Sequence, residues 1–173
     1  SGGQPAAFTA APMIHHGEVE LVVVFQLTLD QINTITQGQE GMGSTGETYL
    51  VGPDLRMRSD SVLDSEQHSV TASFAGTVAE NGIDTVSSRA ALAGQAGQVV
   101  ITDYRGEDVL SMYAPVTNHG LNWAFIAEID EVEAFAPVVH LRNLMIWTFI
   151  IALVAVTVFS LLTAERLSSP ISK

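Results

Sequence analysis

Apolar and polar residues alternate along much of the chain in a way that predicts β-strands interrupted by short helices. Two largely apolar runs, residues 8–14 and the β-branched run 19–27, flank a link that contains Gly17, which is typical of a hairpin. The second run is almost wholly apolar, so we expect a central strand buried on both faces. Residues 28–36 follow with apolar side chains at helical spacing, and they predict a helix.

The middle of the chain has weaker patterns. Residues 47–51 are strand-like and end at a Gly-Pro-Asp turn, and residues 56–60 alternate like a further strand. Residues 61–84 are polar with weak periodicity, so we expect a long excursion from the sheet. Residues 85–93 predict a short helix that ends at Gly94, because glycine readily closes the last turn of a helix.

The last third has the clearest strand pattern. Residues 98–104, 108–116 and 121–129 read as strands separated by short turns, which predicts an antiparallel meander. Together with the N-terminal hairpin, the meander gives an α+β fold with an antiparallel sheet of about five strands and flanking helices.

Residues 144–162 give the strongest single signal, because these 19 consecutive residues carry no charge. As a helix they would be roughly 28 Å long, close to the hydrocarbon thickness of a bilayer. A buried helix of a soluble protein is the alternative, but such helices are rarely apolar on every side for five turns. We therefore expect one transmembrane helix, with its lead-in covering residues 138–163.

The sheet and the expected span are joined without a flexible linker. The helical pattern begins near Asp130, directly after the last predicted strand, where acidic residues suit a helix N-terminus. Pro137 either kinks this helix or marks where it restarts. A shift of the last strand would therefore push, tilt or rotate the span. This stiff join is the feature that points to signalling.

Charge is distributed very unevenly. The net charge is −12, and residues 1–140 hold 18 of the 19 acidic residues and four of the seven basic ones. This balance argues against a nucleic-acid partner. Arg166 and Lys173 follow the span, which favours a cytoplasmic C-terminus and places residues 1–140 outside an inner (cytoplasmic) membrane. Residues 1–5 begin with Ser1 and are interpreted as a linker or the start of a fragment.

Several short segments together resemble a known family. In chain order they are Glu47-Thr-Tyr-Leu-Val-Gly-Pro-Asp54, Arg58-Ser-Asp-Ser61, Ile101-Thr-Asp-Tyr-Arg-Gly106, Tyr113-Ala-Pro-Val116, Gly120-Leu-Asn-Trp-Ala124 and Ala127-Glu-Ile-Asp-Glu-Val-Glu-Ala-Phe-Ala-Pro137. This set resembles the membrane-proximal module of double Cache sensor domains, which are extracytoplasmic PAS-like folds of bacterial chemotaxis receptors and sensor kinases. The tail, residues 164–171, resembles the start of a HAMP linker, in which a proline begins the first helix.

The resemblance implies a domain organisation and a division of roles. Residues 6–137 would be the Cache-like sensor module, and residues 164–173 would begin a HAMP-like linker. Asp130, Pro137 and Pro170 would then belong to the signal relay. The resemblance also implies an upstream span and a distal module, a cytoplasmic output domain, and a homodimer formed through the transmembrane and HAMP-like region.

A ligand pocket is the one chemical site that the residues suggest. Arg56, Arg58 and Asp60 share one face of the predicted strand, where arginine suits a carboxylate and aspartate suits an ammonium group. Tyrosines from neighbouring strands would complete the lining: Tyr49, Tyr104 and Tyr113. The expected ligand is an amino acid, a carboxylate or an amine. The alternative is a solvated strand face with local ion pairs.

The sequence shows no motif for a metal, cofactor or catalytic site. The chain has no cysteine, which excludes disulfides, thiolate zinc sites and cysteine nucleophiles. The five histidines are scattered, and no nucleophile-elbow or phosphate-binding glycine pattern is present. We expect no metal, no cofactor and no catalytic residue. The acidic residues 128–133 are interpreted as charges at the start of the helix, and Trp123 as a core aromatic.

Two functions remain at this point. The first is a membrane-bound receptor segment that senses or relays a small-molecule signal to a cytoplasmic output domain, and is not itself an enzyme. The second is a single-span structural or assembly subunit of a membrane complex, since small residues at Ala152, Ala155 and Ser160 would let other helices pack closely.

Overall fold

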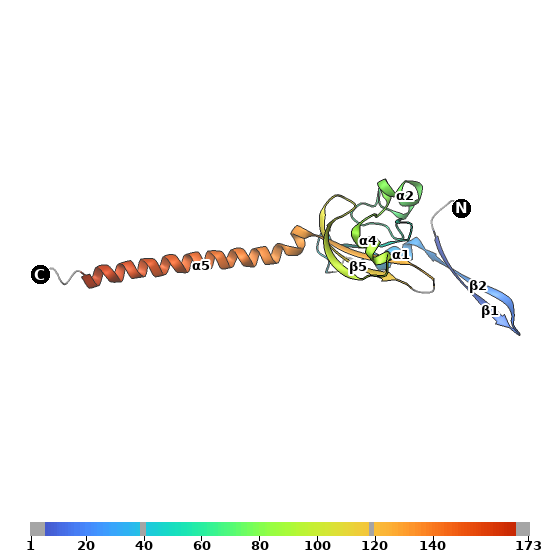
Figure 1. Ribbon diagram of the computed structural model, residues 1–173, viewed down its shortest axis with the longest axis horizontal. Coiled ribbons are helices and arrows are strands. Elements are labelled where there is room, and N and C mark those ends of the chain that lie inside the picture. The colour runs from blue at the N-terminus through green and yellow to red at the C-terminus, as the bar shows by residue number, and fades with distance from the viewer. Residues whose placement is uncertain (1–5, 39–40, 118–119, 169–173) are drawn as a thin grey trace. The chain divides into compact units, whose positions relative to one another are not determined.

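The computed structural model describes residues 6–38, 41–117 and 120–168, and the chain divides into two compact units, Ser1–Glu133 and Ala134–Lys173 (Figure 1). The strands are β1 (Ala6–His15), β2 (Glu18–Thr28), β3 (Glu47–Val51), β4 (Gly97–Thr102), β5 (Asp108–Val116) and β6 (Trp123–Asp130). The helices are α1 (Leu29–Thr36), α2 (Val70–Ala75), α3 (Val78–Asn81), α4 (Val86–Leu92) and α5 (Glu131–Ser168).

The main sheet has four antiparallel strands in the order β3-β6-β5-β4. The meander β4-β5-β6 forms as the alternating pattern predicts, and β3 joins it beside β6. Helix α4 packs against β5 and β6. Antiparallel strands with flanking helices confirm the α+β class.

The N-terminal hairpin does not belong to this sheet, contrary to the expected five strands. Strands β1 and β2 pair only with each other, around a turn in which His16 and Gly17 both have positive φ. Strand β2 is not a central strand buried on both faces. Val22, Val24 and Phe25 are each more than half exposed. The apolar run predicted a strand correctly, but it did not specify what covers that strand.

The core lies on one face of β3 and β6. Tyr49 and Val51 of β3 stand opposite Ile126 and Ala124 of β6, and all four side chains are fully buried. Met57, Val70, Ile83 and Ala91 from the helical and loop segments complete this core. Alternation along each strand sends every second residue inward, so the residues at positions 47 and 128 also face the interior.

Residues 56–60 do not form a strand. A tight turn bends the chain back, with Leu55 at a φ of 59°, and only Met57 makes a bridge, to Val51. The polar excursion from 61 to 84 contains two short helices, α2 and α3, that the weak periodicity did not predict. Ser69 begins α2 by accepting a hydrogen bond from the backbone N–H of Ala72 at 3.2 Å.

Helix α4 matches its prediction closely. The Thr85 side chain accepts a hydrogen bond from the Ser88 backbone N–H at 3.2 Å, and the Ser88 hydroxyl contacts the Thr85 backbone N–H in return. This reciprocal capping fixes the start of the helix. Gly94 follows the C-cap with a φ of +83°, a conformation that residues with a Cβ rarely adopt.

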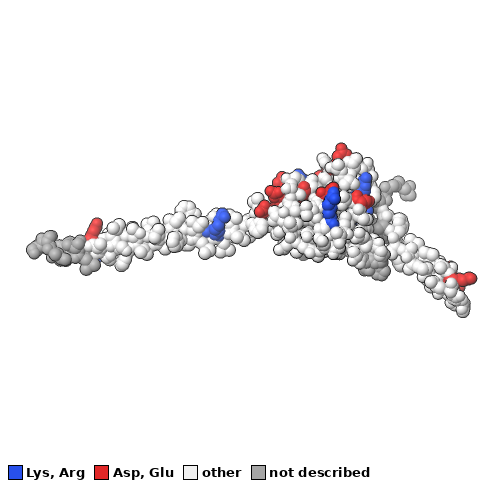
Figure 2. All heavy atoms as spheres, viewed as in Figure 1, with Lys and Arg blue, Asp and Glu red and all other residues white. Residues whose placement is uncertain are grey.

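Helix α5 is one continuous helix, in which Pro137 lies within the first two turns. It begins at the residue after the last residue of β6. The helix is long and apolar enough to cross a membrane, and Figure 2 shows a long stretch of it without charged side chains. Part of the tail that resembles a HAMP linker, residues 169–173 with Pro170, lies outside the described residues.

Candidate functional site

A partly open pocket of about 230 Å³ lies in the first unit, beside α1 and α2. Its lining is almost wholly apolar, with one charged side chain, and consists of Ala6, Leu29, Ile32, Arg58, Val70, Phe74 and Trp123. The pocket is bounded by α1, α2, the start of β1, the start of β6 and the loop after β3. Of the six predicted ligand-binding residues, Arg58 lines this pocket, whereas Tyr113 lines a separate, more open hollow beside Gly97 and Phe125.

The Arg58 guanidinium is held in place from several sides. Its Nη2 donates to Asp54 Oδ1 at 2.7 Å, and its Nη1 donates to the backbone carbonyls of Arg56 and Met57 at 3.1 and 3.3 Å. The cationic group also lies 5.1 Å from the centre of the Phe74 ring, a distance suited to a cation–π contact. These contacts fix the orientation of a cation at an apolar pocket.

The structure places the other two charged members of the predicted pocket elsewhere. Arg56 uses Nη1 to bond the backbone carbonyls of Ser73 and Gly76, so it holds the C-terminal end of α2. Asp60 accepts from the backbone N–H of Val70 and from the Asn33 side chain, both at 2.7 Å. Arg58 and Asp60 therefore do not form the carboxylate-and-ammonium pair that a shared strand face predicted.

The tyrosines of the predicted pocket are also separated. Tyr49 and Tyr104 meet edge to face, with ring centres 5.7 Å apart, in the buried interior. Tyr113 lies on β5, where it packs against the core beside Gly97. None of the three lines the pocket beside Arg58. Whether any of the six predicted residues binds a ligand remains a prediction.

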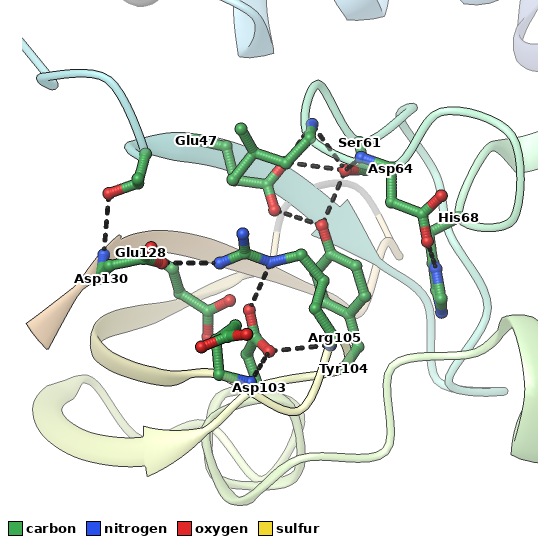
Figure 3. A network of polar contacts seen from close by, with 12 residues as sticks. Glu47, Ser61, Asp64, His68, Asp103, Tyr104, Arg105, Glu128 and Asp130 are labelled. Carbon is green, nitrogen blue, oxygen red and sulfur yellow. Dashed lines mark hydrogen bonds and ion pairs between the residues drawn. The ribbon is translucent and has the colours of Figure 1, made fainter.

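A buried polar network occupies the interior beside these tyrosines (Figure 3). Glu47 is 1% exposed, and its Oε2 accepts from the Ser61 hydroxyl at 2.8 Å and from the Val62 backbone N–H at 3.0 Å. The Tyr104 hydroxyl bonds to Glu47 Oε1. Several donors thus compensate the buried carboxylate for its lost water.

The second buried carboxylate is less well compensated. Glu128 is 2% exposed and stands directly opposite Glu47 in the β3–β6 register. Its Oε2 accepts from the Tyr49 hydroxyl at 2.6 Å, whereas Oε1 has no hydrogen-bond partner among the described residues. Burial, together with the nearby Asp103 and Glu47 charges, raises the pKa of Glu128 to about 7.

Burial also affects the two phenols of the network. It raises the pKa of Tyr49 well above the usual value, and the adjacent Glu128 charge adds to the effect. Burial likewise raises the pKa of Tyr104, with Glu47 as the nearest charge. Both hydroxyls therefore remain protonated and donate to carboxylates, which fixes the direction of these hydrogen bonds.

A set of charged contacts surrounds the point where β6 becomes α5. Arg105 donates from Nε to Asp103 Oδ2 at 2.7 Å and from Nη2 to Asp130 Oδ1 at 2.8 Å. Asp103 has a fully buried side chain, and Asp130 is the last residue of β6. The turn after β4 is thereby tied to the end of β6, and we call this triad the Arg105 clamp.

The loop before β3 also contacts the residues where β6 becomes α5. Glu133 accepts from the backbone N–H groups of Ser44 and Thr45 at 2.8 and 2.9 Å. The Thr45 hydroxyl donates to Glu133 at 2.6 Å and accepts from the Asp130 backbone N–H at 3.1 Å. The predicted relay residue Asp130 thus lies at the centre of two sets of contacts, while Pro137 lies within α5.

The sequence does not predict two features of this region, the buried carboxylates and the helical side of the pocket. Glu128 was interpreted as a charge at the start of a helix, although the alternation Ala124, Ile126, Glu128 places it inward on β6. The same period-two signal would have found Glu47 beside Tyr49 and Val51. Phe74 and the α1 residues of the pocket had no such signal, because their approach to Arg58 depends on loop paths.

Within the described residues, no group of three or more His, Asp or Glu side chains is arranged to hold a metal ion. His68 is paired with Asp64, with Nδ1 and Oδ2 2.7 Å apart, and its ring lies against Tyr104. The buried acids face hydrogen-bond donors and each other, so the arrangement suits a structural polar network.

No family model and no curated protein matches the chain. It is similar in fold to the extracellular domain of a protein named as the histidine kinase mmHK1S-Z3, with 18% identity, a TM-score of 0.49, and coverage of 79% of this chain and 48% of that one. The ligand-binding domain of the Pseudomonas fluorescens chemoreceptor CtaA, in complex with L-leucine, has 16% identity, a TM-score of 0.48, and coverage of 77% and 50%.

A further similar structure is the periplasmic sensory domain of the Campylobacter jejuni chemoreceptor Tlp1, with 14% identity, a TM-score of 0.48, and coverage of 79% and 53%. The chain spans about half the length of each of these three structures. The three are named as an extracellular domain, a ligand-binding domain and a periplasmic sensory domain, respectively.

Proposed function

We propose that the chain is a receptor segment in which an extracytoplasmic sensor module, residues 6–137, passes a small-molecule signal through a membrane-spanning helix to a cytoplasmic output domain. The observation that carries the proposal is the join at Asp130 and Glu131, where the last strand of the sheet becomes the long apolar helix without an intervening residue. Residues 144–162 supply the span, and the C-terminus lies in the cytoplasm.

The Arg105 clamp makes this join suitable for a relay. A ligand shifts an equilibrium between two conformations only by binding one of them more tightly. A change of the sheet then reaches the helix only if the end of β6 cannot move freely on its own. Two buried or half-buried ion pairs of Arg105 and the Glu133 contacts to Ser44 and Thr45 supply that restraint.

The first experiment tests the relay with a matched pair of variants. The full chain is fused through Lys173 to a histidine-kinase output domain, placed in lipid nanodiscs as the assembled receptor, and its autophosphorylation rate is measured. Arg105→Gln should change the basal rate about fivefold, because a coupling of about 1 kcal/mol is lost. Arg89→Gln, which removes an exposed pair with Asp84, should leave the rate unchanged.

Equal autophosphorylation rates for wild type and Arg105→Gln, with circular dichroism showing that the variant is folded, would overturn the relay.

The orientation of the chain in the membrane is tested separately by cysteine labelling. The chain has no cysteine, so a single introduced cysteine is the only labelling site. A membrane-impermeant maleimide should label Glu107→Cys in intact spheroplasts and Arg166→Cys only after permeabilisation. The reverse labelling pattern would contradict the proposed orientation, and isolation of the chain at fixed stoichiometry in a complex without an output domain would favour the assembly subunit.

A further inference from the structure

We infer that the pocket beside Arg58 binds a small carboxylate with an apolar, branched or aromatic body, and that it selects against molecules that carry an ammonium group. This inference rests on the proposed sensor function and names its ligand class. It departs from the broader expectation of an amino acid, a carboxylate or an amine.

The apolar body is indicated by the lining of the pocket. Leu29 and Ile32 from α1 and Val70 and Phe74 from α2 present aliphatic and aromatic surface to a space of about 230 Å³. Trp123 adds a second aromatic side chain at the start of β6. A space of this size and lining holds a small organic molecule whose burial releases water from apolar surface.

The anionic head is indicated by Arg58. It is the one charged side chain among the described residues that line the pocket, and its contacts with Asp54 and two carbonyls use Nη1 and Nη2. No described residue accepts a hydrogen bond from its Nε. A guanidinium fixed in orientation donates well to a carboxylate, and the apolar surroundings strengthen the attraction.

Selection against ammonium groups follows because no carboxylate is among the described residues that line the pocket. The nearest predicted partner for an amine, Asp60, does not line the pocket, and both of its carboxylate oxygens already accept hydrogen bonds. Asp54, which Arg58 engages through Oδ1, does not line the pocket either. An ammonium group brought into this lining would lose its water without gaining a carboxylate partner among the described lining residues, which is costly.

The test compares three molecules that share one branched chain, measured by calorimetry on the full chain in nanodiscs. Isocaproate carries only the carboxylate, isoamylamine carries only the ammonium group, and L-leucine carries both. Isocaproate should bind at least about tenfold more tightly than L-leucine, and isoamylamine should show no binding. Arg58→Gln should weaken isocaproate binding about tenfold or more, whereas the exposed control Arg89→Gln should not.

Ile32→Phe offers a second test, because a larger side chain fills the pocket without removing Arg58. It should also weaken isocaproate binding while the unfolding temperature of the chain stays near that of wild type. Tighter binding of L-leucine, unchanged binding by Arg58→Gln, or no isocaproate binding at all would overturn the inference. None of these results depends on the kinase rate of Arg105→Gln, so the two proposals fail separately.

Discussion

Strands β2 and β6 have similar apolar content but opposite surroundings. Strand β6 alternates, with Ala124, Ile126 and Glu128 buried and the residues between them half-buried, and it has a neighbour on each side. Strand β2 is apolar at seven of its eleven positions, pairs only with β1, and exposes almost all of its described side chains. Residue type therefore predicts an extended backbone, whereas burial of a strand depends on which other elements cover it.

The energetic consequence follows from the number of partners. A strand in the middle of a sheet gains hydrogen bonds on both edges and a packed face, whereas an isolated two-stranded hairpin is marginally stable in water. The stability of the first unit should therefore depend on β6 and its neighbours much more than on the hairpin. Substitutions on the two strands test this directly, and unfolding is measured on the full chain in nanodiscs.

The largest effect is expected at the centre of β6. Ile126 is fully buried, with 0% of its surface accessible to water. Ile126→Ala should lower the free energy of unfolding by roughly 2–5 kcal/mol, because it removes buried surface and leaves a cavity. Ile126→Val should cost about 0.5–1.5 kcal/mol on the same scale. A loss below about 0.5 kcal/mol for the alanine variant would show that β6 is not the core strand.

The second effect is a pH dependence that only the buried sheet should have. The pKa of Glu128 rises from 4.5 to about 7 on folding, so the folded chain holds a proton that the unfolded chain has released. The stabilisation is complete below about pH 4.5 and is lost as the pH rises through 7. In that window the free energy of unfolding should fall by up to about 1.4 kcal/mol per pH unit.

Glu128→Gln should remove this slope, since the amide is neutral at every pH, and the variant should be more stable than wild type at pH 8. Glu47→Gln is the matched control. The amide leaves one acceptor oxygen for the donors Ser61, Val62 and Tyr104 and turns an NH2 group toward the others, so it should destabilise the fold without abolishing the slope. An unchanged slope in Glu128→Gln would assign the pH dependence to another group.

The order and type of most elements were predictable because they depend on local pattern. The meander 98–129 alternates clearly, Thr85 and Gly94 mark the ends of α4, and residues 144–162 have no charge to interrupt a helix. Short helices such as α2 were not predictable, since six residues carry too little periodicity to separate a helix from a loop. The hairpin β1-β2 was predicted as a pair of strands, but the local pattern did not show that it forms a sheet separate from the main one.

The candidate site was predictable only in part, and for a geometric reason. The sequence placed Arg56, Arg58 and Asp60 on one strand face, but the turn at Leu55 removes the strand and turns Arg56 toward the end of α2. Arg58 alone lines the pocket, beside residues from two helices that lie far from it in sequence. Such a site depends on how loops return to the sheet, which residue spacing does not specify.

The smallest effect is expected on the hairpin. Val22 and Val24 lie on the same face of β2, and both are more than half exposed. The double variant Val22→Thr and Val24→Thr keeps the β-branched shape and adds hydroxyl groups, so strand propensity is retained while apolar surface is reduced. Because little of this surface is buried, the free energy of unfolding should change by no more than about 0.5 kcal/mol. A loss well above about 1 kcal/mol would show that this face of β2 is packed in the folded protein and would contradict the contrast between β2 and β6.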